Sequence, residues 1–150
     1  MRHASGAVIL LLAAACAARH PPREISPASA PPAAPRTVQD GVYTEEQGTR
    51  GEAIYFASCV LCHRPEMNGS QVVPPLVGDA FLGKWSRRTA GDLFEWMRTS
   101  MPPVVTARLQ PHEYADVLAY ILSRNRLPAG LQELAADFGT LQRIRMAPGE

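Results

Sequence analysis

The sequence has little net charge and few strand signals, and each shortage excludes a class of protein. Its 15 Lys and Arg residues nearly balance its 14 Asp and Glu residues, so it lacks the one-sided field of a nucleic-acid binder. It shows no phosphate-binding loop, serine–histidine–carboxylate set or pair of catalytic carboxylates. Strand patterns are scarce, whereas helical periodicity is plain. The 150 residues are therefore predicted to form one small all-α domain.

Cysteine is also scarce, yet two of the three cysteines lie in the most informative motif of the chain. Cys59 and Cys62 are three positions apart, and His63 follows directly, which is the attachment signature of c-type haem. Each thiol can add across one vinyl group, and a neutral imidazole is a good ligand for haem iron. We therefore predict one haem c, bound covalently through Cys59 and Cys62, with His63 as its proximal ligand.

Three other interpretations of this motif fit the sequence less well. A thioredoxin-like redox pair would lie on a βαβ unit, and the sequence shows no strand–helix–strand pattern near residue 59. A structural zinc site needs a second pair of ligands at finger-like spacing. The remaining candidates are isolated from one another along the chain: His3, Cys16, His20 and His112. A plain disulfide between Cys59 and Cys62 would leave His63 without a role.

The first part of the chain has the composition of a targeting segment. An apolar run near the N-terminus is too short to span a bilayer, so residues 1–18 are predicted to be a signal peptide for export to the periplasm. The run ends in Ala-Ala-Ala-Cys16, which is similar to a bacterial lipobox, where the cysteine is lipidated and tethers the protein to a membrane. Ordinary cleavage at a neighbouring alanine is equally compatible. Residues 19–41, rich in Pro and Ala, are predicted to be a linker.

Residues 42–130 are predicted to hold the folded domain. Thr44, with Gln47 three positions later, has the form of a capping box, and it opens a helical pattern that leads into the C-x-x-C-H motif. The clearest helix runs from Pro111 to about Arg124, because a proline is tolerated in its first turn and an apolar stripe follows. The stripe consists of Tyr114, Val117, Leu118, Ile121 and Leu122.

Over roughly residues 48–130 the chain resembles class I c-type cytochromes. In that family an N-terminal helix with a glycine and an aromatic residue crosses a C-terminal helix with an aromatic residue of its own; here these would be Gly51, Tyr55 and Tyr120. A glycine inside a helix costs about 1 kcal/mol relative to alanine, which also indicates close approach of another helix at Gly51. The resemblance implies three to four helices around one covalently bound haem.

Met101 is the predicted sixth ligand of the iron. Thioether sulfur is a soft iron ligand, and the two prolines after Met101 stiffen the loop that would present it. Met101 also falls where the family has its axial methionine. Met67 and Met97 are instead interpreted as gap-filling side chains, in a polar turn and a helix interior. The other candidate ligand, His112, should lie on the exposed first turn of the last helix.

The resemblance also implies contacts around the haem. A proline carbonyl accepts a hydrogen bond from the proximal imidazole in this family, here from Pro74 or Pro75 to Nδ1 of His63, which would orient the ring. Trp85 is expected to donate its indole N–H to a haem propionate, although a plain core tryptophan fits the sequence too. Three basic residues flank it and either balance propionate charge or form a solvated turn: Lys84, Arg87 and Arg88.

Residues 131–150 form a C-terminal extension. Its weak apolar spacing resembles the tail of cytochrome domains attached to quinoprotein alcohol dehydrogenases, which wraps back over the body. That resemblance implies a segment packed on the cytochrome domain, with a part in defining a docking face.

The predicted function follows from a closed iron. With His63 and Met101 both bound, no substrate can reach the metal, so the sequence predicts an electron-transfer protein and not an enzyme. It would carry single electrons in the periplasm between a dehydrogenase and an oxidase or other acceptor, alone or as the cytochrome subunit of an oxidoreductase. Two alternatives stay open: a haem enzyme or gas or redox sensor with an open sixth position, and an assembly subunit whose haem is chiefly structural.

Overall fold

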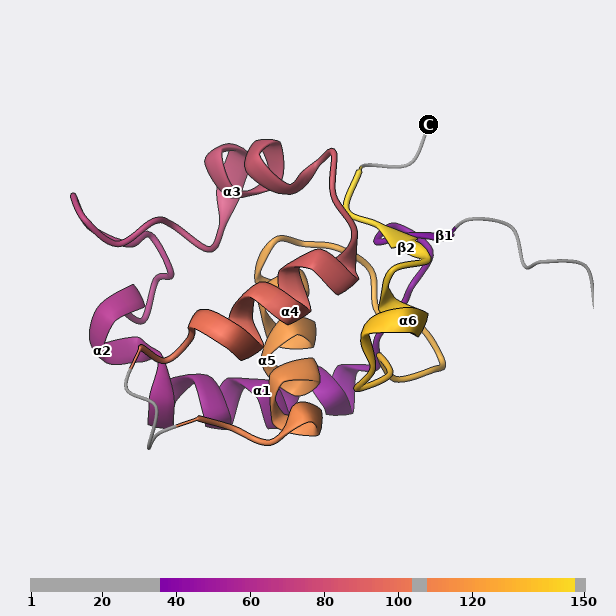
Figure 1. The fold of residues 1–150 in the computed structure, drawn as a ribbon, viewed down its shortest axis with the longest axis horizontal. Coiled ribbons are helices and arrows are strands. Elements are labelled where there is room, and N and C mark those ends of the chain that lie inside the picture. The colour runs from indigo at the N-terminus through magenta and orange to yellow at the C-terminus, as the bar shows by residue number, and fades with distance from the viewer. Residues whose placement is uncertain (1–35, 104–107, 148–150) are drawn as a thin grey trace, which may run out of the picture. The chain divides into compact units, whose positions relative to one another are not determined.

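The computed structural model describes residues 36–103 and 108–147 of the chain. The predictions for the signal peptide, for lipidation of Cys16 and for the first part of the linker fall outside the described residues. In the described part, eight elements follow one another (Figure 1). They are β1 (Arg36–Thr37), α1 (Glu45–Ser58), α2 (Val60–His63), α3 (Gly78–Trp85), α4 (Ala90–Ser100), α5 (Pro111–Arg124), α6 (Phe138–Leu141) and β2 (Ile144–Arg145).

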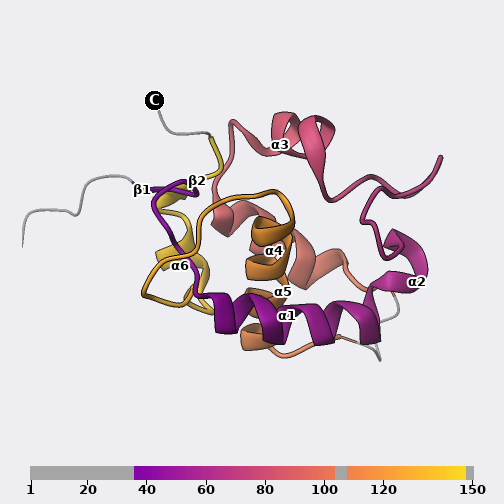
Figure 2. The ribbon, with the colours of Figure 1, turned by 180° about the vertical axis from the view of Figure 1, so that it is seen from behind.

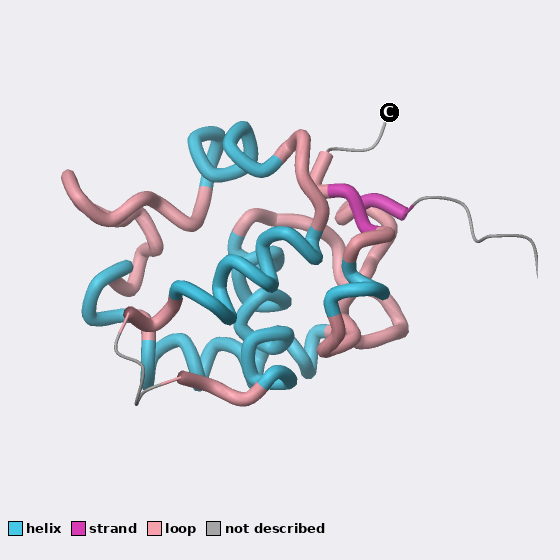
Figure 3. Tube along the Cα trace, viewed as in Figure 1, coloured by secondary structure: helices cyan, strands magenta, loops and turns pink. Residues whose placement is uncertain are grey.

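The prediction of an all-α fold is confirmed, since helices and loops make up almost all of the described chain (Figure 3). Four of the helices there, α1, α3, α4 and α5, have eight residues or more, in line with the three to four that were expected. The other two, α2 and α6, have four residues each. None of the described helices is long and apolar enough to cross a membrane.

Helix α1 begins where the sequence predicted, but only half of the expected capping box forms. The side chain of Thr44 accepts a hydrogen bond from the backbone N–H of Gln47 at 3.1 Å. The side chain of Gln47 turns instead to the backbone of Leu134, donating to its carbonyl at 3.1 Å and accepting from its N–H at 2.8 Å. This pairing satisfies a buried amide, and it fastens the C-terminal segment to α1.

Helices α1 and α5 cross at very short range, and both views of the ribbon show them side by side (Figures 1 and 2). A Cβ added to Gly51 would lie 1.8 Å from the carbonyl oxygen of Asp116, so only glycine allows this approach. The rings of Tyr55 and Tyr120 meet there with their centroids 5.5 Å apart. Arg50 donates to the buried carboxylate of Asp116 at 3.0 Å from two of its nitrogens. The glycine and aromatic crossing that the family resemblance implied is therefore present.

The C-terminal segment packs on the helical body. Helix α6 contacts α4, and β2 pairs in parallel with β1, with Arg36 opposite Ile144. Four of its apolar side chains are buried: Leu134, Leu141, Ile144 and Met146. Because β1 belongs to this sheet and Val38 is 1% exposed, the folded region already includes residues 36–41. The predicted linker boundary at residue 41 was therefore too late.

Candidate functional site

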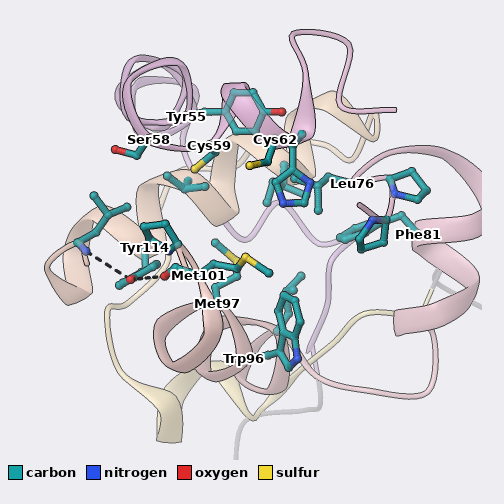
Figure 4. Close-up of a pocket in the computed structure, with 18 of the residues that line it drawn as sticks. Tyr55, Ser58, Cys59, Cys62, Leu76, Phe81, Trp96, Met97, Met101 and Tyr114 are labelled. Carbon is teal, nitrogen blue, oxygen red and sulfur yellow. Dashed lines mark hydrogen bonds between the residues drawn. The ribbon is translucent and has the colours of Figure 1, made fainter. Parts of the chain in front are cut away.

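All seven residues that the sequence singled out line one cavity of about 850 Å³, part of which is open to solvent. They are Cys59, Cys62, His63, Pro74, Pro75, Trp85 and Met101. The wall comes from α1 to α5 and from the loops before α3 and after α4, and Figure 4 shows side chains from these elements facing the same space. Residues separated by more than forty positions are thus brought to one place.

The C-x-x-C-H motif folds as a tight turn at the end of α1. Cys59 ends α1 and begins α2, and its carbonyl accepts from the backbone N–H of Cys62 at 3.2 Å and of His63 at 3.0 Å. Both thiols are free, so no disulfide links them. Burial, and then the nearby Cys62, raises the pKa of the Cys59 thiol to about 11. Such a thiol is protonated at neutral pH, unlike the low-pKa cysteine of a thioredoxin-like site.

His63 presents a buried, neutral imidazole to the cavity. Its side chain is 7% exposed, and burial lowers its pKa, which the backbone carbonyl of Pro74 opposes. The hydrogen bond from Nδ1 to the carbonyl of Pro74 or Pro75 stays a prediction; the effect on this pKa is the observation that favours Pro74. No partner lies within full hydrogen-bond geometry of Nδ1, which is buried. A neutral ring in this setting is suited to ligate a metal through its other nitrogen.

Two methionines reach the cavity from the opposite wall. Met101 follows the last residue of α4, and its backbone N–H donates to the carbonyl of Met97 one turn earlier at 2.8 Å. The side chains of both line the cavity, and Figure 4 shows their sulfur atoms extending into it. Met97 was interpreted as a gap-filler, and its place on this wall was missed. Met67 is fully buried elsewhere, and the exposed His112 is not part of the wall.

Aromatic side chains close one end of the cavity. Trp85 is 5% exposed and contacts the edge of Trp96, with the ring centroids 6.3 Å apart. The ammonium of Lys84 lies 5.6 Å from the ring of Trp85 and 5.5 Å from that of Trp96. Trp96 also lines the cavity while remaining 37% exposed. The sequence did not single out Trp96; its position three residues after Leu93 in α4, on the same helix face, was the available signal, since Leu93 lines the cavity as well.

Tyr114 is a second residue whose role at the site the sequence did not reveal. It was assigned to the apolar stripe of α5, and its ring is indeed buried. Its hydroxyl, however, donates to the carbonyl of Met101 and accepts the N–H of Leu109 at 3.3 Å, as Figure 4 shows. An apolar stripe identifies which ring faces the core, but it does not reveal the partner of the ring's polar end.

The donors around this cavity fit a haem of the c type. Most of the wall of this cavity is apolar, as the walls of cofactor pockets are. Two free thiols stand beside a buried imidazole whose Nδ1 has no hydrogen bond, and thioether sulfurs face them, which are ligand types that haem iron takes. Within residues 36–103 and 108–147, no three His, Cys, Asp or Glu side chains gather as a zinc site would require.

Comparison with known families agrees with this chemistry. The family model described as "Cytochrome C oxidase, cbb3-type, subunit III" matches residues 46–121, a span from the first turn of α1 to the last part of α5. Neither the curated proteins nor the solved structures that were searched contain a significant match.

Proposed function

We infer the function of this chain from its family and from its cavity together: the chain belongs to the family described as cytochrome C oxidase, cbb3-type, subunit III, whose model covers half of it. It is a class I c-type cytochrome, and haem-based electron transfer is the activity of that family. We propose that it carries one haem c, attached through Cys59 and Cys62, with His63 and Met101 as axial ligands. The convergence of these four side chains on one cavity is the observation that supports the proposal.

The chain's own residues divide the work of holding such a group. The turn at Cys59 and Cys62 would anchor the group through the two thiols, and His63 would offer it a neutral ring as a ligand. When bound, a haem supplies an iron that gains and loses one electron at a time. The apolar wall keeps water from this iron. The packing of α5 against α1 and α4 would hold the wall in one shape while the iron changes its oxidation state.

Two fixed axial ligands favour a carrier over an enzyme. With an imidazole on one side and a thioether on the other, the iron would have no position for a substrate or a gas. A haem enzyme or a sensor needs that position, and the cavity offers a soft ligand from the opposite wall. Electron transfer without catalysis is therefore the function that the geometry supports best.

We further propose that the protein works in the periplasm, between a dehydrogenase that donates electrons and an oxidase or other acceptor. Support comes from the sequence, because the apolar run within residues 1–18 resembles an export signal. The lipobox-like segment at Cys16 would tether the protein to a membrane. We also propose that the C-terminal segment resembles the tail of cytochrome domains attached to quinoprotein alcohol dehydrogenases. Its packing on the helical body supports this proposal.

Three measurements test this function on protein matured with a c-type haem system. Intact mass and a haemochrome assay should give one covalent haem per chain, and Cys62→Ser should lose most of it. Carbon monoxide added to the reduced wild type should leave its spectrum unchanged. Stopped-flow mixing with a small redox protein should give fast, single-electron exchange. Two haems, ready binding of carbon monoxide or turnover of peroxide would contradict the proposal.

A further inference from the structure

Met101 is fixed by more contacts than its place at the end of a helix requires. The last carbonyls of an α-helix have no partner within the helix and must find one elsewhere. At the end of α4, the guanidinium of Arg108 donates to the carbonyls of Arg98 and Thr99, both at 2.7 Å. This fork therefore closes the turn immediately before Met101.

A second side chain fixes Met101 itself. The hydroxyl of Tyr114, on the first turn of α5, donates to the carbonyl of Met101 and accepts the N–H of Leu109. The Tyr114 ring is 2% exposed and lines the cavity, so it has little freedom to move. One rigid hydroxyl thus joins two backbone groups that lie eight positions apart. Figure 4 shows this pair of hydrogen bonds beside the methionine side chains.

We propose that Tyr114 and Arg108 form a clasp that holds the backbone of Met101 at the cavity and so sets how readily this sulfur leaves the iron. The inference rests on the proposed role of Met101 as sixth ligand and deepens it. Both are positioning residues, because neither would touch the iron. The clasp acts on the rate of ligand release, since a methionine can leave only if its backbone or side chain swings away from the haem.

The chain offers a matched control for each half of the clasp. Tyr43 is likewise buried and donates its hydroxyl to a backbone carbonyl, that of Leu127, at 2.7 Å, but it does not line the cavity. Arg36 donates one guanidinium nitrogen to the carbonyls of Asp40 and Gly41, at 3.4 and 3.3 Å, also away from the cavity. Tyr43→Phe and Arg36→Gln therefore remove the same chemical groups as the two clasp variants, but at sites away from Met101 and the cavity.

The test uses the ferric holoprotein and cyanide, which binds only after the methionine has left. At saturating cyanide, the observed rate becomes the rate of methionine release. Tyr114→Phe should raise it about tenfold, the effect of losing one buried hydrogen bond, and Arg108→Gln should raise it as well. The two control variants should stay within about twofold of wild type. Denaturant unfolding of all four separates loosening of the ligand from loss of overall stability.

The outcomes distinguish this inference from the proposed function. If the wild type shows the weak optical band of methionine sulfur on ferric iron, and both clasp variants bind cyanide at the wild-type rate, the clasp is wrong and the ligand assignment stands. If the wild type lacks that band, the ligand assignment fails and the clasp fails with it. Arg108 is exposed, so Arg108→Gln gives an answer even if Tyr114→Phe folds poorly.

Discussion

Helices α1 and α3 both bury aromatic side chains, but they pack against different partners. Helix α1 crosses α5 in the most extensive helix–helix contact of the described chain, with backbone against backbone at Gly51. Helix α3 makes only slight contact with any other described helix or strand. Its buried side chains, Phe81 and Trp85, face the cavity. The packing of α1 is therefore provided by the chain itself, whereas the packing of α3 depends on what fills the cavity.

Substitution of one glycine in each helix tests this difference directly. It should give the largest change in unfolding free energy of the variants considered. A Cβ at Gly51 would collide with Asp116, whereas a Cβ at Gly83, in α3, would meet nothing within 4 Å. Gly51→Ala should therefore cost about 3 kcal/mol or more of unfolding free energy in the holoprotein. Gly83→Ala should be neutral or stabilising by up to about 1 kcal/mol, because alanine favours the helix. Equal denaturation midpoints for the two variants would show that α1 and α5 do not pack at this range.

Removing haem attachment should separate the two regions further. In a Cys59→Ser/Cys62→Ser double variant, the amides of α3 should exchange with solvent at least about tenfold faster than those of α1 and α5, since α3 loses the surface it packs on. Hydrogen exchange followed by mass spectrometry measures this, with the attached wild type as reference. Uniform protection in all three helices would mean that α3 is held by the chain alone.

Met97 and Met101 allow a comparison within the cavity wall. Both side chains line the cavity, but only Met101 is proposed as the ligand. Met101→Ala should remove the methionine–iron band, let the reduced protein bind carbon monoxide and lower the reduction potential. Met97→Leu keeps the volume and should retain the band, with a small change in potential. The reverse pattern, with the band lost in Met97→Leu, would move the ligand assignment by one helical turn.

The smallest expected change in unfolding free energy comes from the first turn of helix α4. The backbone N–H of Thr89 lowers the pKa of Asp92 below its ordinary value, and the side chain of Gln142 adds to this. A carboxyl whose pKa is lowered by folding stabilises the fold at a pH above the pKa of the unfolded chain. This stability is lost as the pH falls from that pKa through the lower pKa of the folded state. Asp92→Ala should cost about 1 kcal/mol at neutral pH and progressively less below about pH 4. Asp137→Ala, at the exposed cap of α6, is the matched control and should change less.

The sequence could predict the features that depend on local spacing. The positions of Cys59, Cys62 and His63 within one turn placed both thiols and the imidazole on one wall. The apolar stripe with Pro111 at its first turn located α5, which begins at that residue. Gly51 indicated a close helix crossing because a glycine costs stability inside a helix, and because Tyr55 and Tyr120 complete the crossing pattern that the family resemblance implied.

The remaining features depend on partners that lie far along the chain. Gln47 had the right spacing to cap its own helix, yet its amide pairs with Leu134, 87 positions away. The strands β1 and β2 have two residues each, too short to leave a pattern, so the folded region was predicted to start too late. Tyr114 was recognised as buried, but only the fold shows that its hydroxyl meets Met101.

The optical spectrum of the matured wild-type protein, oxidised and reduced, tests the central claim most directly. The account predicts a low-spin haem, a weak long-wavelength band from methionine sulfur on ferric iron, and no change when carbon monoxide is added to the reduced form. A high-spin spectrum that lacks this band, or prompt binding of carbon monoxide, would contradict ligation by His63 and Met101 and would favour an enzyme or a sensor.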